Sequence, residues 1–429
     1  GPPPARIALR DSTRQGPSMS EPVTHATVEA VMRRDYGRLI AYLSARSGDV
    51  AGAEDALGEA FASAMKRWPE DGIPGKPEAW LLHVARNKMI DTVRHRQVRE
   101  QAVERLMVSD EFRNQEASEP EPIPDDRLKL LFVCAHPAID PAARTPLMLQ
   151  TVLGVDAARI ASAFLVSPAA MSQRLVRVKT KIREAAIPFR VPEPAEWDER
   201  LSFVLDAIYA AYTTGWESVA ETETTHHALA GEAISLGRTL LTLMPDEPEA
   251  LGLLSLMLHC EARRDARLSH KGDFSPLAQQ DPPRWSRSMI TEAEDSLRTA
   301  STAGNIGRYQ LEAAIQSIHA NRARTGIIDW PEILLLYEGL VQFSPGIGPL
   351  VGRAVAMAES GHAEAALDSL GRLPPARIAS YQPYWAARGH LLFLLDRKEE
   401  AKDALTRAAS LTDDPALRAH LLKRAAEFP

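Results

Sequence analysis

The stretch "SPAAMSQRLVRVKTKIRE", Ser167 to Glu184, carries five Lys or Arg residues and one Glu. Ser167 is a good helix N-cap, and Pro168 suits the first helical position because its missing N–H would have no partner there. We therefore expect a helix to begin here. Its apolar residues recur at steps of four, three and four, which predicts one core-facing stripe made of Met171, Leu175, Val178 and Ile182.

The basic side chains on the other side of this helix indicate contact with nucleic acid. Upstream, "DPAARTPLMLQTVLG" ends at Gly154, a candidate helix C′ residue, and "VDAARIASAF" predicts a short helix with Asp156 as N-cap. Helix, short helix, tight turn and basic helix form the outline of a helix-turn-helix, whose last helix enters the major groove. The candidate DNA contacts on it are Gln173, Arg174, Arg177 and Lys181. The alternative interpretation is a solvated basic face without a ligand.

Length and composition favour a helical protein of several domains. The chain has 429 residues, enough for about three domains at the usual ~100–200 residues each. Hydrophobic residues make up 45% and aromatic residues only 6%, and strict alternation of apolar and polar residues is rare. The prediction is an all-α protein.

The net charge of −7 hides an asymmetry along the chain. Residues 1–192 hold 27 basic and 24 acidic residues, whereas residues 193–429 hold 23 and 33. Within the first part, residues 101–126 alone hold two basic and eight acidic residues, which predicts a flexible acidic linker. The rest of that part is basic, as expected of a protein that binds phosphates.

Cysteine content and apolar runs point to a soluble protein of a reducing compartment. The two cysteines, Cys134 and Cys260, form no paired framework, so we expect a cytoplasmic location and no disulfide. The longest apolar runs fall short of the ~18–20 residues that span a bilayer, so no membrane contact is expected. The opening "GPPPARIALRDSTRQGPS" lacks the apolar core of a signal peptide.

A second basic helix is predicted in the first hundred residues. "GDVAGAEDALGEAFASAMKRWP" begins at the candidate cap Asp49 and carries an apolar stripe of Ala53, Ala56, Leu57, Ala60, Phe61, Ala64 and Met65. After the loop "PEDGIPGKP", the segment "EAWLLHVARNKMIDTVRHRQVR" predicts another helix. Its apolar face holds Leu82, Ala85, Met89 and Val93, and its polar faces hold Asn87, Asp91 and Arg94 with Arg86, Lys88, Arg96 and Arg99.

The C-terminal half predicts a stack of helical pairs. "GHAEAALDSL" at 361–370 and "DRKEEAKDAL" at 396–405 align at an offset of 35, close to the ~34-residue period of tetratricopeptide repeats. Each such pair buries its apolar face only against its neighbours. Four aromatic residues are either contacts of a binding surface or part of the core: Trp197, Tyr209, Tyr212 and Trp216.

Two basic helices on one tether suggest a protein that grips two sites on one duplex, and these segments resemble a known family. "GDVAGAEDALGEAFASAMKRWP" with "EAWLLHVARNKMIDTVR" resembles region 2 of bacterial sigma factors of the extracytoplasmic-function (ECF) group. "IASAFLVSPAAMSQRLVRVKTKIRE" is similar to their region 4. "DDRLKLLFVCAHPAI", Asp125 to Ile139, resembles a signature of the subgroup with a C-terminal tetratricopeptide-like extension.

The resemblance implies a factor that docks on core RNA polymerase and directs it to promoter DNA. It implies core-polymerase contacts at Asp49, Glu54, Asp55, Glu59 and Phe61. It implies contacts with the −10 element at Asn87, Lys88, Asp91, Arg94 and Arg96, with the loop from Glu70 to Pro77 and Asn87 forming the pocket for a flipped base. It implies that the helix at 168–185 reads the −35 element through its Gln173, Arg174, Arg177 and Lys181 side chains.

The resemblance also implies a division of the chain. Residues 1–26 are expected to be a disordered tail or an expression remnant, 27–100 the region 2 domain, 101–126 the acidic linker, 127–187 the region 4 helix-turn-helix domain and 188–429 the tetratricopeptide-like domain. The last domain is expected to regulate the factor, through an intramolecular contact or a contact with another protein. The charge of this domain does not indicate whether it activates or inhibits the factor.

Two positions depart from the family pattern. Where relatives commonly show two adjacent cysteines before His-Pro, this chain has Cys134-Ala135-His136-Pro137, and where a Thr-x-x-Glu-like capping box is common it has Asp156 and Arg159. Cys134 and His136 are too few for a structural zinc site, so no metal and no cofactor is expected. No nucleophile elbow, phosphate loop or paired catalytic carboxylate stands out, so no enzyme activity and no catalytic residue is predicted.

Two other function classes remain open from the sequence. One is a stand-alone helix-turn-helix regulator with a repeat-type sensor domain, which would bind its operator without polymerase. The other is a repeat-type adaptor whose basic helices are merely solvated, which predicts no salt-dependent DNA binding.

Overall fold

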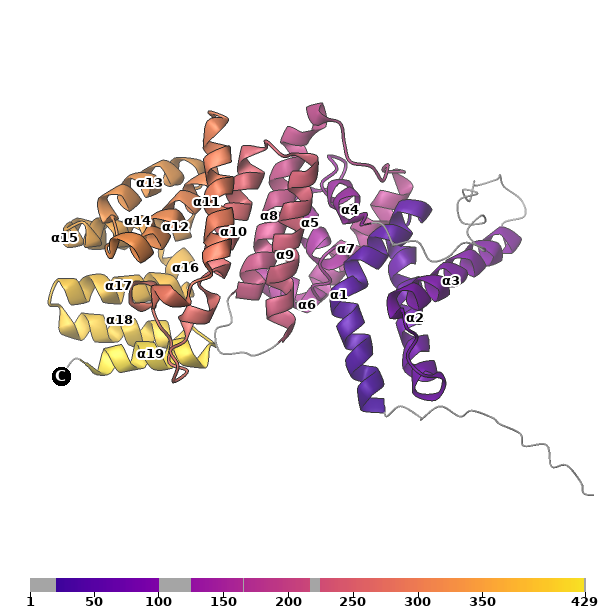
Figure 1. The fold of residues 1–429 in the computed structure, drawn as a ribbon, viewed down its shortest axis with the longest axis horizontal. Helices are drawn as coiled ribbons and strands as arrows, with labels where there is room; N and C mark the ends of the chain where they lie inside the picture. Colours follow the sequence, from indigo (N-terminus) through magenta and orange to yellow (C-terminus); the bar gives the residue numbers. More distant parts are fainter. Residues whose placement is uncertain (1–20, 100–124, 165, 217–223, 428–429) are drawn as a thin grey trace, which may run out of the picture. The chain divides into compact units, whose positions relative to one another are not determined.

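The computed structural model describes residues 21–99, 125–164, 166–216 and 224–427. Within these ranges the chain is built of helices and contains no strand, apart from an isolated bridge between Leu268 and Phe274. The all-α prediction is confirmed (Figure 1). The chain divides into two compact units, Gly1–Leu201 and Ser202–Pro429, and the division falls inside helix α8 (Trp197–Trp216).

The first unit contains seven helices within its described ranges. They are α1 (Glu21–Ser47), α2 (Val50–Asp71), α3 (Pro77–Arg99), α4 (Arg127–Cys134), α5 (Pro141–Thr151), α6 (Ala157–Ala163) and α7 (Pro168–Glu184). A short 3-10 turn, η2 (Pro194–Glu196), precedes α8. The order helix, short helix, turn and basic helix that the sequence predicts is present in α5 to α7.

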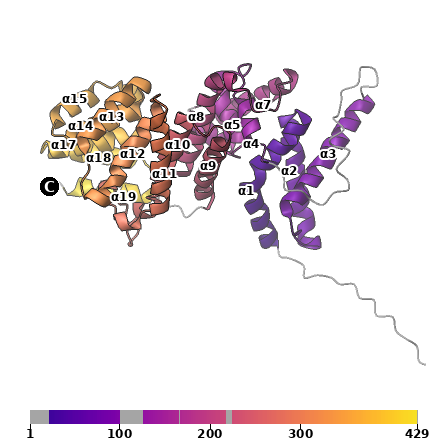
Figure 2. The same ribbon diagram turned by 45° about the horizontal axis from the view of Figure 1, so that its top comes forward.

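Helices α1, α2 and α3 lie side by side as a three-helix bundle (Figure 1, Figure 2). Asp49 caps α2, because its Oδ1 accepts the N–H of Gly52 at 3.1 Å. The predicted apolar stripe of α2 is buried except for Met65, which is 37% exposed. Stripe residues and Trp68 therefore form the inner face that holds α1 and α3.

The α4–α7 bundle begins its helices at the predicted caps. The Ser167 hydroxyl accepts the N–H of Ala170 at 3.2 Å, and Asp156 accepts the N–H of Arg159 at 2.9 Å. The four stripe residues of α7 are buried, as predicted. Gly154 has a φ of +66°, a left-handed conformation that suits glycine after a helix end.

The second unit contains α8 and eleven further helices within its described ranges. These are α9 (Thr224–Leu243), α10 (Pro248–Glu261), α11 (Arg287–Thr302), α12 (Arg308–Thr325), α13 (Trp330–Phe343), α14 (Ile347–Glu359), α15 (Ala363–Gly371), α16 (Pro375–Ile378), α17 (Gln382–Leu394), α18 (Lys398–Ser410) and α19 (Pro415–Ala426). Three 3-10 turns, η3 (Arg264–Arg267), η4 (Leu277–Gln279) and η5 (Pro282–Arg284), lie between α10 and α11.

The sequence offset of 35 corresponds to a repeated helical pair. The turn between α14 and α15 contains Gly361 with a φ of +91°, and the turn between α17 and α18 contains Asp396 with a φ of +57°. Glycine adopts this conformation without strain, and aspartate tolerates it better than most residues. Since α15 and α18 begin at Ala363 and Lys398, the two pairs are equivalent in structure as well as in sequence.

Polar side chains join α8, α10 and α12 of the second unit. The Tyr309 hydroxyl donates to Asp206 at 2.7 Å, and the Arg308 Nε donates to Glu312 at 2.8 Å. Glu249 of α10 accepts the backbone N–H groups of Tyr309 and Gln310 at the start of α12. Of the four aromatic residues singled out in the sequence, Tyr212 is buried and the other three are half-buried: Trp197, Tyr209 and Trp216.

Candidate functional site

A groove of about 300 Å³ lies between α2 and α3. It collects three of the residues implied as −10 contacts, Asn87, Lys88 and Asp91. Its remaining lining residues come from the same two helices and are Ser63, Arg67, Trp80, His83 and Val84. Residues between 13 and 28 positions apart in the sequence, from Ser63 and Arg67 to Trp80 and Asp91, therefore meet in one concave surface.

The chemistry of this groove combines an aromatic face, an amide and cations. The Trp80 ring packs edge-on against the buried Trp68, with centroids 5.5 Å apart, which holds the indole in place. The Asn87 Nδ2 lies 3.0 Å from the His83 Nε2. An aromatic face stacks on a base, an amide reads its edge, and cations offset the charge of phosphates. The groove therefore suits a single-stranded nucleotide.

Lys88 of this groove is already paired. Its Nζ lies 2.7 Å from the Glu59 carboxylate of α2, and this hydrogen bond raises the pKa of Lys88. Both side chains are exposed, so an incoming phosphate competes with Glu59 for the ammonium in water. Glu59, implied as a polymerase contact, thus touches a residue implied as a DNA contact.

Two other residues that the resemblance implies as contacts of the −10 element are described only by their backbone. The backbone of Arg94 and Arg96 belongs to α3, but the side chains of both lie outside the described residues. Sequence reasoning missed Arg67, Trp80 and His83. The signal was present for α3, because positions 80, 84, 87 and 91 recur at steps of four, three and four and so share one helical face.

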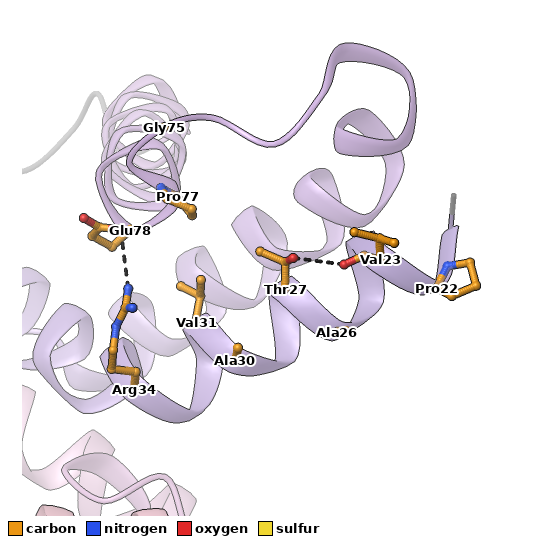
Figure 3. Close-up of a pocket in the computed structure, with 10 residues that line it drawn as sticks. All are labelled: Pro22, Val23, Ala26, Thr27, Ala30, Val31, Arg34, Gly75, Pro77 and Glu78. Atoms are coloured by element: carbon orange, nitrogen blue, oxygen red, sulfur yellow. Dashed lines mark hydrogen bonds and ion pairs between the residues drawn. The ribbon is translucent and has the colours of Figure 1, made fainter. Parts of the chain in front are cut away.

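The loop between α2 and α3 contributes to a different groove. Gly75 and Pro77 line a groove of about 740 Å³ against α1, together with Val23, Ala26 and other residues of that helix (Figure 3). At one end Arg34 points to Glu78 across 3.7 Å (Figure 3). The loop and Asn87, which the resemblance places in one pocket, line two separate grooves.

The outer face of α7 presents a stripe of polar and basic residues. Gln173, Arg177 and Lys181 are exposed and follow one another at steps of four. At 1.5 Å per residue this stripe is about 12 Å long, which fits a major groove about 12 Å wide. Arg174 is half-buried, and its Nη1 reaches toward the Ala142 carbonyl at 3.5 Å.

The residues implied as polymerase contacts fall into three environments on α2. Asp55 and Glu59 are exposed, and Phe61 is buried in the α1–α3 bundle. Asp49 caps the helix and lies 3.5 Å from Arg183. Glu54 forms an ion pair with Lys179 of α7, and the Lys179 side chain is only 8% exposed.

Burial dominates the electrostatics around Glu54. Desolvation raises its pKa, and the opposing attraction of Lys179 does not fully offset this. Lys179 also donates to the Gln150 Oε1 at 2.7 Å. Cys134 lies in the same region, and burial raises the pKa of its thiol to about 12, so the thiol stays protonated.

Cys134 and His136 do not converge on a common ligand. The Cys134 sulfur lies 3.7 Å from the Thr151 hydroxyl, whereas the His136 Nδ1 accepts the N–H of Ala138. Arg144 holds the same turn by donating to the Ile139 carbonyl at 3.0 Å. Over the described ranges, no group of three or more His, Cys, Asp or Glu residues is arranged to hold a metal ion.

The described helices include none with the length and apolar character needed to cross a membrane.

Comparisons with known proteins match two stretches of the chain to families and find one similar whole protein. Residues 31–99, which contain both groove helices from Ser63 to Asp91, match the family described as Sigma-70 region 2. Residues 200–301 match a family of unknown function, DUF6596. An uncharacterized protein of Rhizobium meliloti (strain 1021) is 40% identical over 374 residues, which cover 86% of this chain and 88% of the relative. No solved structure matches.

Proposed function

We propose that this chain, which belongs to the same family as its rhizobial relative and carries a sigma-70 region 2 domain, is an RNA polymerase sigma factor that directs core polymerase to promoters. A sigma-70 region 2 implies binding to core RNA polymerase and to promoter DNA. The observation that carries the proposal is the groove between α2 and α3, since it lies within the matched region and has the chemistry to hold a flipped base.

In this proposal the groove receives the −10 element. Trp80 stacks on the extruded base, and Asn87 reads its edge, while Lys88 exchanges Glu59 for a backbone phosphate. Asp91 lies on the same wall. Arg94 and Arg96 continue along α3 and hold the strand beyond the groove.

The exposed stripe of α7 reads the −35 element. Arg177 and Arg174 make bidentate contacts to guanine, each worth about 1–3 kcal/mol of discrimination between bases. Gln173 and Lys181 complete the contact. Asp55 and Glu59, with Asp49 and Glu54, form the α2 surface that binds core polymerase, while Phe61 acts from within the α1–α3 bundle, where it is buried.

The second unit regulates this activity as a helical-repeat domain. Support comes from the repeated pairs α14–α15 and α17–α18, which are typical of stacks that bind proteins. We place the chain with the ECF sigma factors that carry a tetratricopeptide-like extension.

Reconstitution tests the proposal directly. The purified full chain is mixed with bacterial core RNA polymerase, and stable complex formation and initiation from genomic promoter fragments are measured. We expect both, and we expect Trp80→Ala to reduce initiation while complex formation is retained. Arg298→Ala, at a residue 71% exposed on α11, is the control for surface charge. DNA binding by the chain alone, with no association with polymerase, would favour the stand-alone regulator instead.

A further inference from the structure

Several buried side chains of the second unit carry polar atoms that have no hydrogen-bond partner among the described residues. His259 lies in the last turn of α10 and Arg263 just after its end, and these residues are only 1% and 6% exposed. Both ring nitrogens of His259 and the Nη1 of Arg263 are unpartnered. His319 of α12 is 8% exposed, and its Nδ1 is unpartnered as well. Because buried polar atoms are normally paired, these side chains point to a partner outside the chain.

The helices that carry these side chains pack against one another. Helices α10, α11 and α12 lie side by side (Figure 1, Figure 2). The Arg263 Nη2 donates to the Gln316 Oε1 of α12 at 2.6 Å, which fixes the guanidinium between α10 and α12. Burial lowers the pKa values of His259 and His319, and the charge of Arg263 lowers both further. The guanidinium therefore lies within electrostatic reach of both rings.

The charge of Arg263 has no counterion in the described part of the chain. Its Nη2 contacts are neutral, namely the Gln316 amide oxygen and the Cys260 sulfur at 3.7 Å. The adjacent Arg264 differs, since its Nε and Nη2 donate to both oxygens of Glu261. Burying a cation without a negative partner is strongly disfavoured. An anion from solution would supply the missing charge.

A second guanidinium, that of Arg322 on α12, borders the same cluster. Its Nη1 and Nη2 donate to carbonyl oxygens of the loop between α10 and α11 at 2.7 to 3.0 Å. Its Nε is unpartnered, as is the indole N–H of the buried Trp285, whose ring lies 5.2 Å from the guanidinium carbon. Burial lowers the pKa of Arg322, and the charge of Arg263 lowers it further, so the two cations are close. Arg322 is half-buried, which places this edge of the cluster at the surface.

One carboxylate borders the cluster beside His259. The Glu294 Oε1 of α11 accepts the Ser317 hydroxyl at 2.6 Å and lies 3.4 Å from the His259 Nε2. With a proton on Nε2, the Nδ1 of a neutral ring only accepts hydrogen bonds, and it donates once the ring is protonated. An anion at Nδ1 therefore favours the charged ring, which Glu294 stabilises from its other side.

We propose that the cluster of His259, Arg263, His319 and Arg322 binds one small oxyanion, a phosphate or a carboxylate group. Guanidinium and imidazolium N–H groups are the donors that such anions prefer. Water also satisfies buried polar atoms, but it leaves the charge of Arg263 unpaired. Two guanidinium groups repel a metal cation, so the histidines are not metal ligands here. The site lies within the second unit and does not depend on the role proposed for the chain in transcription.

Isothermal titration calorimetry on the full chain, in a chloride buffer without phosphate, tests the site. Inorganic phosphate and acetate are separate probes, which distinguish the two groups. We expect saturable binding of at least one probe with a Kd below about 1 mM. Arg263→Gln removes the unpaired charge and should weaken binding at least about tenfold. Arg324→Gln makes the same change at an exposed position of α12 and should have no effect.

A second measurement follows the histidines of the parent chain by NMR. A bound anion favours the charged rings, so the probe that binds should raise the pKa values of His259 and His319 from about 3 and about 4. Chloride at the same ionic strength is the control for screening. His259→Gln and His319→Gln assign the two signals, because each variant loses one of them.

The outcomes separate this site from other basic surfaces. No saturable binding of either probe would overturn the proposal and leave water as the partner of these atoms. Equal binding by the parent and Arg263→Gln would also overturn it, because the ion would then lie elsewhere, for example on the basic face of α7. If Arg263→Gln loses its helices by circular dichroism, the parent decides alone: a rise in the histidine pKa values supports the site, and unchanged values overturn it.

Discussion

Two carboxylates, one in each unit, differ in how far their hydrogen bonds are satisfied. In the second unit, Glu249 accepts three hydrogen bonds, from the backbone N–H groups of Tyr309 and Gln310 and from the Gln310 side chain, at 3.0 to 3.3 Å. In the first unit, the Glu54 Oε2 meets Lys179, while its Oε1 is buried with no hydrogen-bond partner among the described residues. Both oxygens of the Glu249 carboxylate therefore accept hydrogen bonds, whereas only one oxygen of the Glu54 carboxylate does.

This difference distinguishes a permanent contact from a separable one. A buried oxygen without a partner costs about 1–3 kcal/mol, and water regains that hydrogen bond when the helices part. Glu54 therefore gains hydration on opening, which offsets part of the lost attraction to Lys179. Glu249 gains nothing comparable, because both of its carboxylate oxygens already accept hydrogen bonds in the packed state.

The largest expected effect is a pH-dependent loss of stability in the second unit. His259 and His319 lie in α10 and α12, and burial lowers their pKa values to about 3 and about 4 from 6.5, assisted by the nearby Arg263. Arg322 lowers the His319 pKa further, and Glu294 lies 3.4 Å from the His259 Nε2. In the folded state both rings therefore stay neutral from pH 6.5 down to about pH 4.

The unfolded chain takes up these protons as the pH falls below about 6.5, so stability falls from there toward pH 3–4. At pH 5 the loss is about 2 kcal/mol for each histidine, at about 1.4 kcal/mol per pH unit. Urea unfolding of the second unit at pH 7 and pH 5 measures it. His259→Gln should remove about half of the pH dependence, and the exposed His362→Gln should leave it intact. Equal pH dependence in the parent and in His259→Gln would contradict the assignment.

The next effect is the loss of the Glu249 contact. Glu249→Ala leaves two backbone donors of α12 without their acceptor and removes one of the two acceptors of the Gln310 side chain, so at about 1 kcal/mol for each hydrogen bond the unfolding free energy should fall by about 2–3 kcal/mol. Denaturant unfolding at pH 7 measures this change. Glu292→Ala removes an exposed ion pair with Arg238 and should cost less than about 1 kcal/mol. Similar losses in the two variants would mean that the α10–α12 contact is no stronger than a surface pair.

Patterns of neighbouring residues in the sequence were sufficient to predict the helices and their N-caps. Ser167, Asp156 and Asp49 cap their helices as the sequence predicts, since a cap depends only on residues three positions away. The buried stripe of α7 followed from the helical period in the same way. The 35-residue offset aligns Gly361 with Asp396 in the sequence. It did not predict that Asp396 shares the left-handed backbone conformation of Gly361, because that conformation is common for glycine and uncommon for aspartate.

Contacts between distant segments were not predictable in this way. The pairing of Glu54 with Lys179 joins residues 125 positions apart, and no local pattern distinguishes Lys179 from the exposed Lys181 except its position on the apolar side of α7. The groove shows the same limit. Its α3 wall follows from spacing along one helix, whereas Arg67 and Ser63 enter only through the packing of α2 against α3.

A smaller effect is expected for the ion pair of the first unit. Lys179→Met keeps the length of the side chain and removes its charge. If the bundles stayed packed, the buried Glu54 charge would cost about 3–5 kcal/mol. We expect the bundles to separate instead, which would limit the loss in unfolding free energy to about 1 kcal/mol. Hydrogen exchange should accelerate in the contact region of α1, α2 and α7, and a loss of 3 kcal/mol or more without local exchange would show that the contact does not open.

The smallest effect is expected at the rim of the same contact. Arg183 is 42% exposed and lies 3.5 Å from Asp49, so its attraction is screened by water and salt. Arg183→Ala should change the unfolding free energy by less than about 0.5 kcal/mol, and the change should vanish in 1 M salt. Asp49 keeps its cap on Gly52 in this variant, so α2 should retain its N-terminal protection from hydrogen exchange. Asp49→Ala is the matched comparison, because it removes the cap as well as the ion pair and should cost about 1 kcal/mol. Equal losses in the two variants would assign the stabilisation to the ion pair between Arg183 and Asp49 and would leave no contribution for the cap.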